Sequence, residues 1–164
     1  MRRPRKPDAA ASEADERTVR TAALGLLAGR AFAREELAKR LARRGYQPAI
    51  VESVVAGLVA ERLLSESRFT AQFIRQHAGR GHGPLRIRME LRERGVAETD
   101  IDEALAAAGE DWVAVAREAR RKRFGAAGPA DFRERARQGR FLQYRGFSSE
   151  QIRAALGPGD DIEP

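Results

Sequence analysis

One six-residue motif occurs three times in this chain at nearly equal spacing. Each copy has Leu four residues before a Gly, Arg directly before it and a large apolar residue directly after it; the copies are residues 41–46, 91–96 and 142–147. An aliphatic residue also follows six positions after each Gly (Val51, Ile101 and Ile152). The glycines lie 50 residues apart (45 to 95) and 51 apart (95 to 146). A fixed period of this kind is typical of tandem repeats of one structural unit.

The motif has the composition of a helix end followed by a tight corner. In the central copy, Gly95 fits the position just past the helix, where the backbone turns left-handed and a Cβ atom would clash. Leu91 and Val96 then occupy the two positions whose side chains meet in a Schellman ending. Arg94 faces the negative end of the helix dipole. We therefore predict positive φ at the glycine of every copy.

The apolar residues between the corners follow the helical period, which predicts an all-α chain. We expect three tandem three-helix units, each trihelical and resembling a helix-turn-helix, that form an elongated curved array. The units are placed at residues 17–64, 65–109 and 110–157, between a disordered basic tail at residues 1–16 and an acidic tail at residues 158–164. The alternative, three unrelated helix corners, leaves the matched positions and the equal spacing unexplained.

Three helix starts carry side chains suited to capping. Thr99 is expected to cap the helix that follows the central corner, with Asp102 as a weaker capping-box partner. Residues 65–67 are expected to cap an earlier helix, and Ser148 with Gln151 forms a capping box before the last one.

Composition excludes several classes of protein. The chain has no cysteine, so disulfides and thiolate chemistry are excluded. No apolar run approaches the roughly 18 residues of a membrane span, and the N-terminus has no apolar segment of the kind found in secretory signals. We expect a cytoplasmic protein without a membrane partner.

The positive charge is concentrated in one segment. The whole chain carries a net charge of +7. Residues 115–145 alone hold ten basic and three acidic residues, a difference that equals the charge of the whole chain. Such a concentration indicates a surface that faces a polyanion. The alternative is that these arginines only solvate alanine-rich helix faces.

The sequence offers no candidate for catalysis. The two histidines, His77 and His82, have no partner at metal-ligand spacing. Residues 79–84 hold three glycines around Arg80, but they lack the Gly-Lys-Ser/Thr ending of a nucleotide-binding loop. We read this segment as a corner, and we expect a protein that is not an enzyme, with no catalytic residues, metal or cofactor.

Ten short segments carry a family resemblance, and together they extend over about residues 19–156. They are residues 23–30, 36–41, 44–46, 63–69, 73–75, 81–87, 90–91, 94–96, 121–122 and 141–148. No single segment is diagnostic, but the ordered set is specific, and it resembles the RecX family of bacterial recombination regulators. One departure is at residues 65–67, where the family usually has acidic residues and this chain keeps only Glu66.

The resemblance implies a monomeric regulator that lies along the groove of the RecA–DNA filament. It would inhibit filament extension, ATP hydrolysis, strand exchange and co-protease activity, in DNA repair, recombination and the SOS response. Its partners would be the RecA filament and, weakly and without sequence preference, single- and double-stranded DNA.

We predict a basic partner-binding or DNA-binding face with fifteen members. They are Arg40, Arg43, Arg44, Arg75, Arg80, Arg86, Arg88, Arg92, Arg117, Arg120, Arg121, Lys122, Arg123, Arg137 and Arg140. Two other functions remain open, a stand-alone non-sequence-specific nucleic-acid-binding protein and a helical scaffold without any nucleic-acid link. Sequence-specific reading of DNA is disfavoured, because the expected third helices at residues 99–108 and 148–156 are acidic or rich in alanine.

Overall fold

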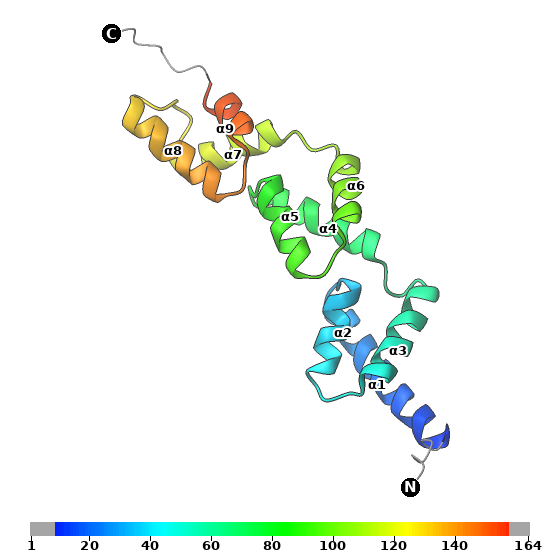
Figure 1. Cartoon of the computed structure of the whole chain (residues 1–164). Helices are drawn as coiled ribbons and strands as arrows, with labels where there is room; N and C mark the ends of the chain where they lie inside the picture. Colours follow the sequence, from blue (N-terminus) through cyan, green and yellow to red (C-terminus); the bar gives the residue numbers. More distant parts are fainter. Residues whose placement is uncertain (1–8, 158–164) are drawn as a thin grey trace, which may run out of the picture. The chain divides into compact units, whose positions relative to one another are not determined.

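The computed structural model describes residues 9–157, with side chains from residue 15 onward. This part of the chain consists of helices and contains no strand (Figure 1). In order, the helices are α1 (Ala9–Gly29), α2 (Arg34–Ala42), α3 (Pro48–Ala60), α4 (Glu66–Gly79), α5 (Pro84–Glu93), α6 (Glu98–Ala108), α7 (Trp112–Phe124), α8 (Phe132–Tyr144) and α9 (Ser149–Leu156). The prediction of an all-α chain with three tandem three-helix domains is confirmed.

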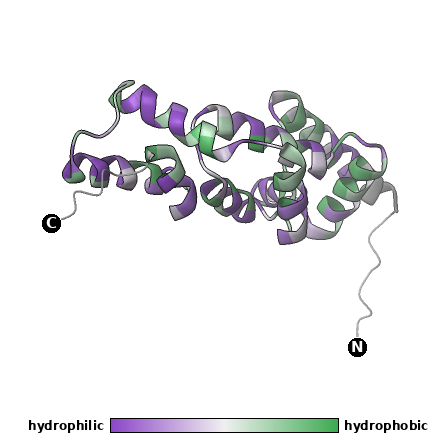
Figure 2. Ribbon diagram, turned by 90° about the horizontal axis from the view of Figure 1, so that it is seen from above, coloured by the Kyte–Doolittle hydropathy of each residue, from purple (hydrophilic) through white to green (hydrophobic). Residues whose placement is uncertain are grey.

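The helices form two compact units. Of the described residues, the first comprises 9–69 and 94–96, and the second comprises 70–93 and 97–157. Hydrophilic and hydrophobic residues alternate along the same helices (Figure 2), as expected when each helix buries one stripe and exposes the other. None of the helices within residues 9–157 combines the length and the apolar composition that a membrane crossing requires.

Aliphatic side chains build the core of the first unit. Leu37 and Leu41 on α2 pack with Leu58 on α3, and all three are fully buried. Arg20 on α1 reaches Glu61 just after α3 with two hydrogen bonds, of 2.9 and 2.7 Å. This exposed bidentate pair links the two helices, which also pack on each other.

The second unit has its apolar residues in two places. Ile87 and Leu91 on α5 are fully buried, as is Ile101 on α6. Around α7, α8 and α9, the buried cluster consists of Ala116, Ala119, Leu142, Phe147 and Ala155. The aromatic side chains of Trp112 and Phe141 are partly buried against this cluster.

The three glycine corners have the predicted conformation. The φ angles of Gly45, Gly95 and Gly146 are 87°, 82° and 93°. At the third corner, the amide of Phe147 donates to the carbonyl of Leu142 at 3.2 Å. The amide of Gly146 donates to the carbonyl of Gln143 at 3.0 Å, which completes a Schellman ending.

Two corners of the second unit meet through their backbones. The amide of Gly83, between α4 and α5, donates to the carbonyl of Arg145 at 2.8 Å. The amide of Leu85 donates to the carbonyl of Gly146 at 3.0 Å. A Cβ atom on Gly146 would overlap Arg86, so the third corner must be glycine for a second reason besides its φ angle.

Two expectations about helix starts need correction. Ala97, not Thr99, is the N-cap of α6, and it makes no side-chain cap bond. Helix α1 begins at Ala9, so residues 9–16 are helical where we expected a disordered tail. The basic residues before them and the acidic tail lie outside the described residues. By contrast, Ser65 caps α4 through the amide of Arg68 at 3.3 Å, and the capping box of Ser148 and Gln151 is present.

Candidate functional site

A basic pocket of about 430 Å³ lies in the second unit. It is formed by the end of α4 and the loop after it, by α7, and by the end of α8. The lining residues are Ala78, Gly79, Arg80, Gly81, Ala114, Val115, Glu118, Ala119, Lys122, Arg123, Phe141 and Arg145. Four of these side chains are cationic and one is acidic, so the pocket suits an anionic group.

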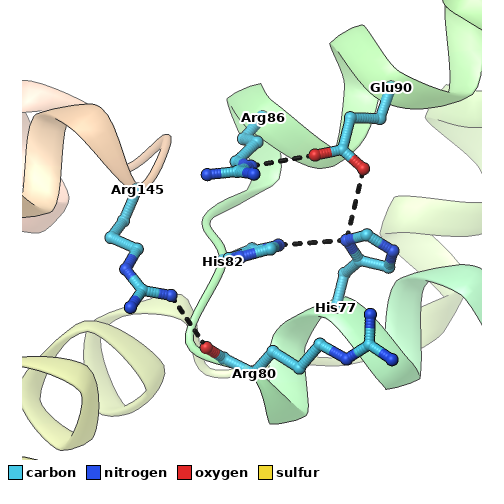
Figure 3. Close-up of polar contacts among 6 residues, drawn as sticks. All are labelled: His77, Arg80, His82, Arg86, Glu90 and Arg145. Atoms are coloured by element: carbon cyan, nitrogen blue, oxygen red, sulfur yellow. Dashed lines mark hydrogen bonds and ion pairs between the residues drawn. The ribbon is translucent and has the colours of Figure 1, made fainter.

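Close packing of the loop after α4 on α7 shapes this pocket. Gly81 has a φ of 78°, and a Cβ atom there would stand 3.0 Å from the Cβ of Ala119. Arg145 also contacts this loop: its guanidinium donates to the carbonyl of Arg80 at 3.1 Å, as Figure 3 shows. The Arg145 guanidinium lies 5.2 Å from the ring centre of Phe141, within range of a cation–π contact.

Glu118 offsets part of the positive charge of the pocket. Its carboxylate accepts two hydrogen bonds of 2.8 Å from Arg121 and lies 3.7 Å from the ammonium of Lys122. The hydrogen bonds from Arg121 are the main cause that lowers the pKa of Glu118, and they raise the pKa of Arg121. Arg80, Arg123 and Arg145 have no carboxylate partner among residues 15–157, so their charge is available to a bound anion.

The structure removes Arg120 from the predicted basic face. Arg120 is buried, with 9% of its surface exposed. Its guanidinium donates to the carbonyls of Gly125, Ala126 and Ala127 at 3.4, 3.3 and 2.8 Å, and to the side-chain oxygen of Gln138 at 3.2 Å. This arginine therefore holds the loop between α7 and α8 and cannot meet a phosphate, contrary to the prediction.

The predicted arginines of α5 are engaged in ion pairs. Arg86 pairs with Glu90 at 2.8 Å. Arg88 and Arg92 both pair with Glu98 at the start of α6, and Arg88 also pairs with Asp102 at 2.5 Å. These hydrogen bonds raise the pKa values of Arg88 and Arg92 and lower the pKa of Glu98. Arg88 and Arg92 thus join α5 to α6, and the α5 arginines present little net charge.

The remaining predicted residues are dispersed. Arg40, Arg43 and Arg44 are exposed in the first unit, and Arg75 and Arg140 are exposed in the second. Arg117 donates to the carbonyl of Ala154 at 3.0 Å, and Arg137 pairs with Glu134 at 3.2 Å. Of the fifteen predicted residues, the pocket brings together Arg80, Lys122 and Arg123.

Sequence reasoning missed Arg145 as a site residue. It belongs to the basic segment and stands directly before the third corner glycine, where we assigned it to the helix end alone. Arg145 lines the pocket because the third corner lies close to Arg80. No local sequence pattern predicts this contact.

Neither histidine has a partner at metal-ligand spacing in the sequence, but the structure brings both histidines together with Glu90. The Nδ1 atoms of His77 and His82 lie 3.0 Å apart, and Nδ1 of His77 lies 3.4 Å from the Glu90 carboxylate (Figure 3). The pKa of His82 falls to about 4, chiefly because of burial and also because of Arg86, His77 and Arg145. The chain turns back after α4 and so brings His82 and Glu90 beside His77. The spacing of these residues along the sequence does not show this approach.

Comparison with known proteins identifies the family. Sequence models of three RecX domains match in order: the first three-helix domain at residues 20–58, the second at 65–105 and the third at 109–156. Regulatory protein RecX of Halorhodospira halophila is 53% identical over 152 residues, 93% of this chain and 92% of that protein. Regulatory protein RecX of Pseudomonas fluorescens strain Pf-5 is 46% identical over 144 residues, with coverage of 87% and 93%.

Two crystal structures share the fold. A structure described as regulatory protein RecX has a TM-score of 0.73 and 22% identity, and the match covers 92% of this chain and 78% of that one. RecX from Lactobacillus salivarius has a TM-score of 0.74 and 18% identity, with coverage of 88% and 96%. With three family domains in order and relatives that match along nearly the whole chain, this protein belongs to the RecX family of regulatory proteins.

Proposed function

We propose that this protein binds the RecA–DNA filament in the bacterial cytoplasm and inhibits its extension. Slower ATP hydrolysis, strand exchange and co-protease activity would follow, because each of these activities depends on an extended filament. The protein would act by binding, as a monomer and without a cofactor. Its family membership supports a regulatory role, and the resemblance to RecX supplies the partner.

The observation that carries this proposal is the basic pocket of the second unit. A filament groove offers acidic protein side chains and DNA phosphates together. Arg80, Arg123 and Arg145 have no carboxylate partner in the described chain, and arginine suits both kinds of anion because its planar fork binds two oxygens at once. The pocket is therefore our candidate for the contact with the filament.

A second candidate function is weak, non-specific binding of single- or double-stranded DNA by the protein alone. Helix α8 favours it, because Arg133, Arg137, Arg140 and Tyr144 recur at helical spacing on one face. Tyr144 is 83% exposed, and an exposed aromatic ring among arginines can stack on a nucleic-acid base. In the RecA proposal, this face would contribute DNA contacts at the filament.

One binding experiment separates these functions. The pocket variant Lys122→Ala/Arg123→Ala and a charge-matched control, Arg17→Ala/Arg153→Ala, are titrated onto RecA–single-stranded DNA filaments and onto bare DNA at several salt concentrations. Arg17 and Arg153 are exposed and lie outside the predicted basic face. We expect the wild type to bind filaments more tightly than bare DNA, and the pocket variant to lose most of that preference.

The salt dependence reports direct phosphate contact. Each phosphate contact on single-stranded DNA contributes roughly 0.7 to the slope of log affinity against log salt. If both pocket residues meet phosphates, the slope falls by about 1.4 in the pocket variant and stays unchanged in the control. Equal wild-type affinity for filament and bare DNA would contradict the RecA proposal and favour stand-alone DNA binding.

A further inference from the structure

Three potential metal ligands converge beside the corner between α4 and α5. His77 lies in the last turn of α4, His82 in the corner, and Glu90 on α5 (Figure 3). One ligand atom from each residue lies within 4.8 Å of the other two. This cluster is separate from the basic pocket, and the proposed function makes no use of it.

The distances between these atoms fit a tetrahedral zinc site. Zinc binds His nitrogen at about 2.0–2.1 Å and carboxylate oxygen at about 2.0–2.2 Å, so two ligand atoms of a tetrahedron stand about 3.3–3.4 Å apart. The two Nδ1 atoms are 3.0 Å apart, and Nδ1 of His77 is 3.4 Å from the Glu90 oxygen. Ligand atoms of His82 and Glu90 lie within 4.8 Å of each other, which keeps all three residues within reach of one ion.

Neighbouring side chains hold the ligands in position. Arg86 donates to one oxygen of Glu90 at 2.8 Å, and the other oxygen of Glu90 faces His77. The ring of His77 stacks on Phe73 with the ring centres 3.9 Å apart. Support of this kind around metal ligands fixes their orientation and strengthens binding.

The charges around the cluster are mixed. Arg86 and Arg145 lie beside it and repel a cation, while the Glu90 carboxylate pairs with Arg86 and offsets its charge. We therefore expect binding weaker than at a site built from cysteine thiolates.

We propose that His77, His82 and Glu90 bind a divalent transition-metal ion of the zinc type, with the fourth position open to water. Two imidazoles and one carboxylate suit Zn²⁺, and also Co²⁺ as its spectroscopic substitute. The ion would join the end of α4, the corner and α5. Because Gly83 directly follows His82 and donates to the Arg145 carbonyl, the bound ion would stabilise the contact between the two corners.

The test is a titration of metal-free full-length protein without a polyhistidine tag. Co²⁺ is added first, and its visible absorption distinguishes a site of low coordination number from the hydrated ion. Zn²⁺ is then added to displace it. The ligand variants are His82→Ala and Glu90→Gln, and the matched control is Glu93→Gln on the same helix. Circular dichroism establishes that each variant is folded.

We expect one equivalent of Co²⁺ to bind the wild type and Glu93→Gln, with displacement by Zn²⁺. Folded His82→Ala is expected to bind at least ten-fold more weakly, since it loses one of three ligands. Zn²⁺ is also expected to raise the unfolding temperature of the wild type and not that of His82→Ala. Absence of Co²⁺ absorption in the wild type, or binding that His82→Ala and Glu90→Gln leave unchanged, would overturn the proposal.

Discussion

The amide of Gly83 donates to the carbonyl of Arg145 at 2.8 Å, across 62 residues of sequence (83 to 145). Through this bond the loop before α5 rests on the corner between α8 and α9. The same corner supplies Arg145 to the basic pocket, and the same loop supplies His82. The contact between Gly83 and Arg145 therefore positions both the basic pocket and the proposed metal site.

Replacing Gly146 with Ala tests this contact. The change should cost roughly 1–2 kcal/mol for the left-handed backbone and about 1–3 kcal/mol more because the new Cβ atom overlaps Arg86. Gly109→Ala is the control in the same unit, since Gly109 has a φ of 61° and a Cβ atom there would meet no distant residue within 4 Å. Urea unfolding measures both losses, and equal losses would show that the corners do not touch.

The buried arginine of α7 gives a second prediction. Arg120→Ala removes four hydrogen bonds to the α7–α8 loop and Gln138. We expect a loss of about 3 kcal/mol in the free energy of unfolding, because hydrogen bonds from a charged donor are strong and the buried side-chain oxygen of Gln138 loses its partner. The adjacent Arg121→Ala should leave stability nearly unchanged, because Arg121 pairs with Glu118 at the surface. Similar effects of the two substitutions would contradict this distinction.

The ion pairs of Glu98 should make the stability of the protein depend on pH. Hydrogen bonds from Arg92, and then from Arg88, lower the pKa of Glu98 below its ordinary value of 4.5. A carboxylate with a depressed folded-state pKa contributes stability above its unfolded-state pKa, and loses that contribution as the pH falls through the folded-state value. The wild type should therefore unfold at a higher temperature than Glu98→Gln at neutral pH, and the difference should vanish in acid. A difference that persists in strong acid would exclude the ion pairs as its cause.

The sequence was informative where structure depends on near neighbours. The corner glycines were predicted because the left-handed turn depends on residues four before to one after each of them. The capping box of Ser148 and Gln151 was predicted for the same reason. Thr99 has equally suitable chemistry, but α6 begins one residue before it, at Glu98. The start of a helix that directly follows a glycine corner therefore depends on the geometry of the corner as well as on the capping side chain.

The candidate site was predicted less well, because it depends on helix faces and distant contacts. Arg120 stands in a run of four basic residues, but it also lies four positions after the buried Ala116 and next to Ala119. The helical period of α7 could therefore have shown that it faces inward. No such signal exists for the approach of Arg145 to Arg80, which joins residues 65 positions apart.

Inhibition of RecA is tested most directly by the rate of ATP hydrolysis by RecA on single-stranded DNA, measured with increasing amounts of this protein. We expect inhibition at amounts well below one molecule per RecA, because a filament stopped at its growing end or along its groove needs few inhibitors. Lys122→Ala/Arg123→Ala should inhibit less than the Arg17→Ala/Arg153→Ala control. An unchanged rate with the wild type, even at one molecule per RecA, would contradict the proposed regulation of the filament.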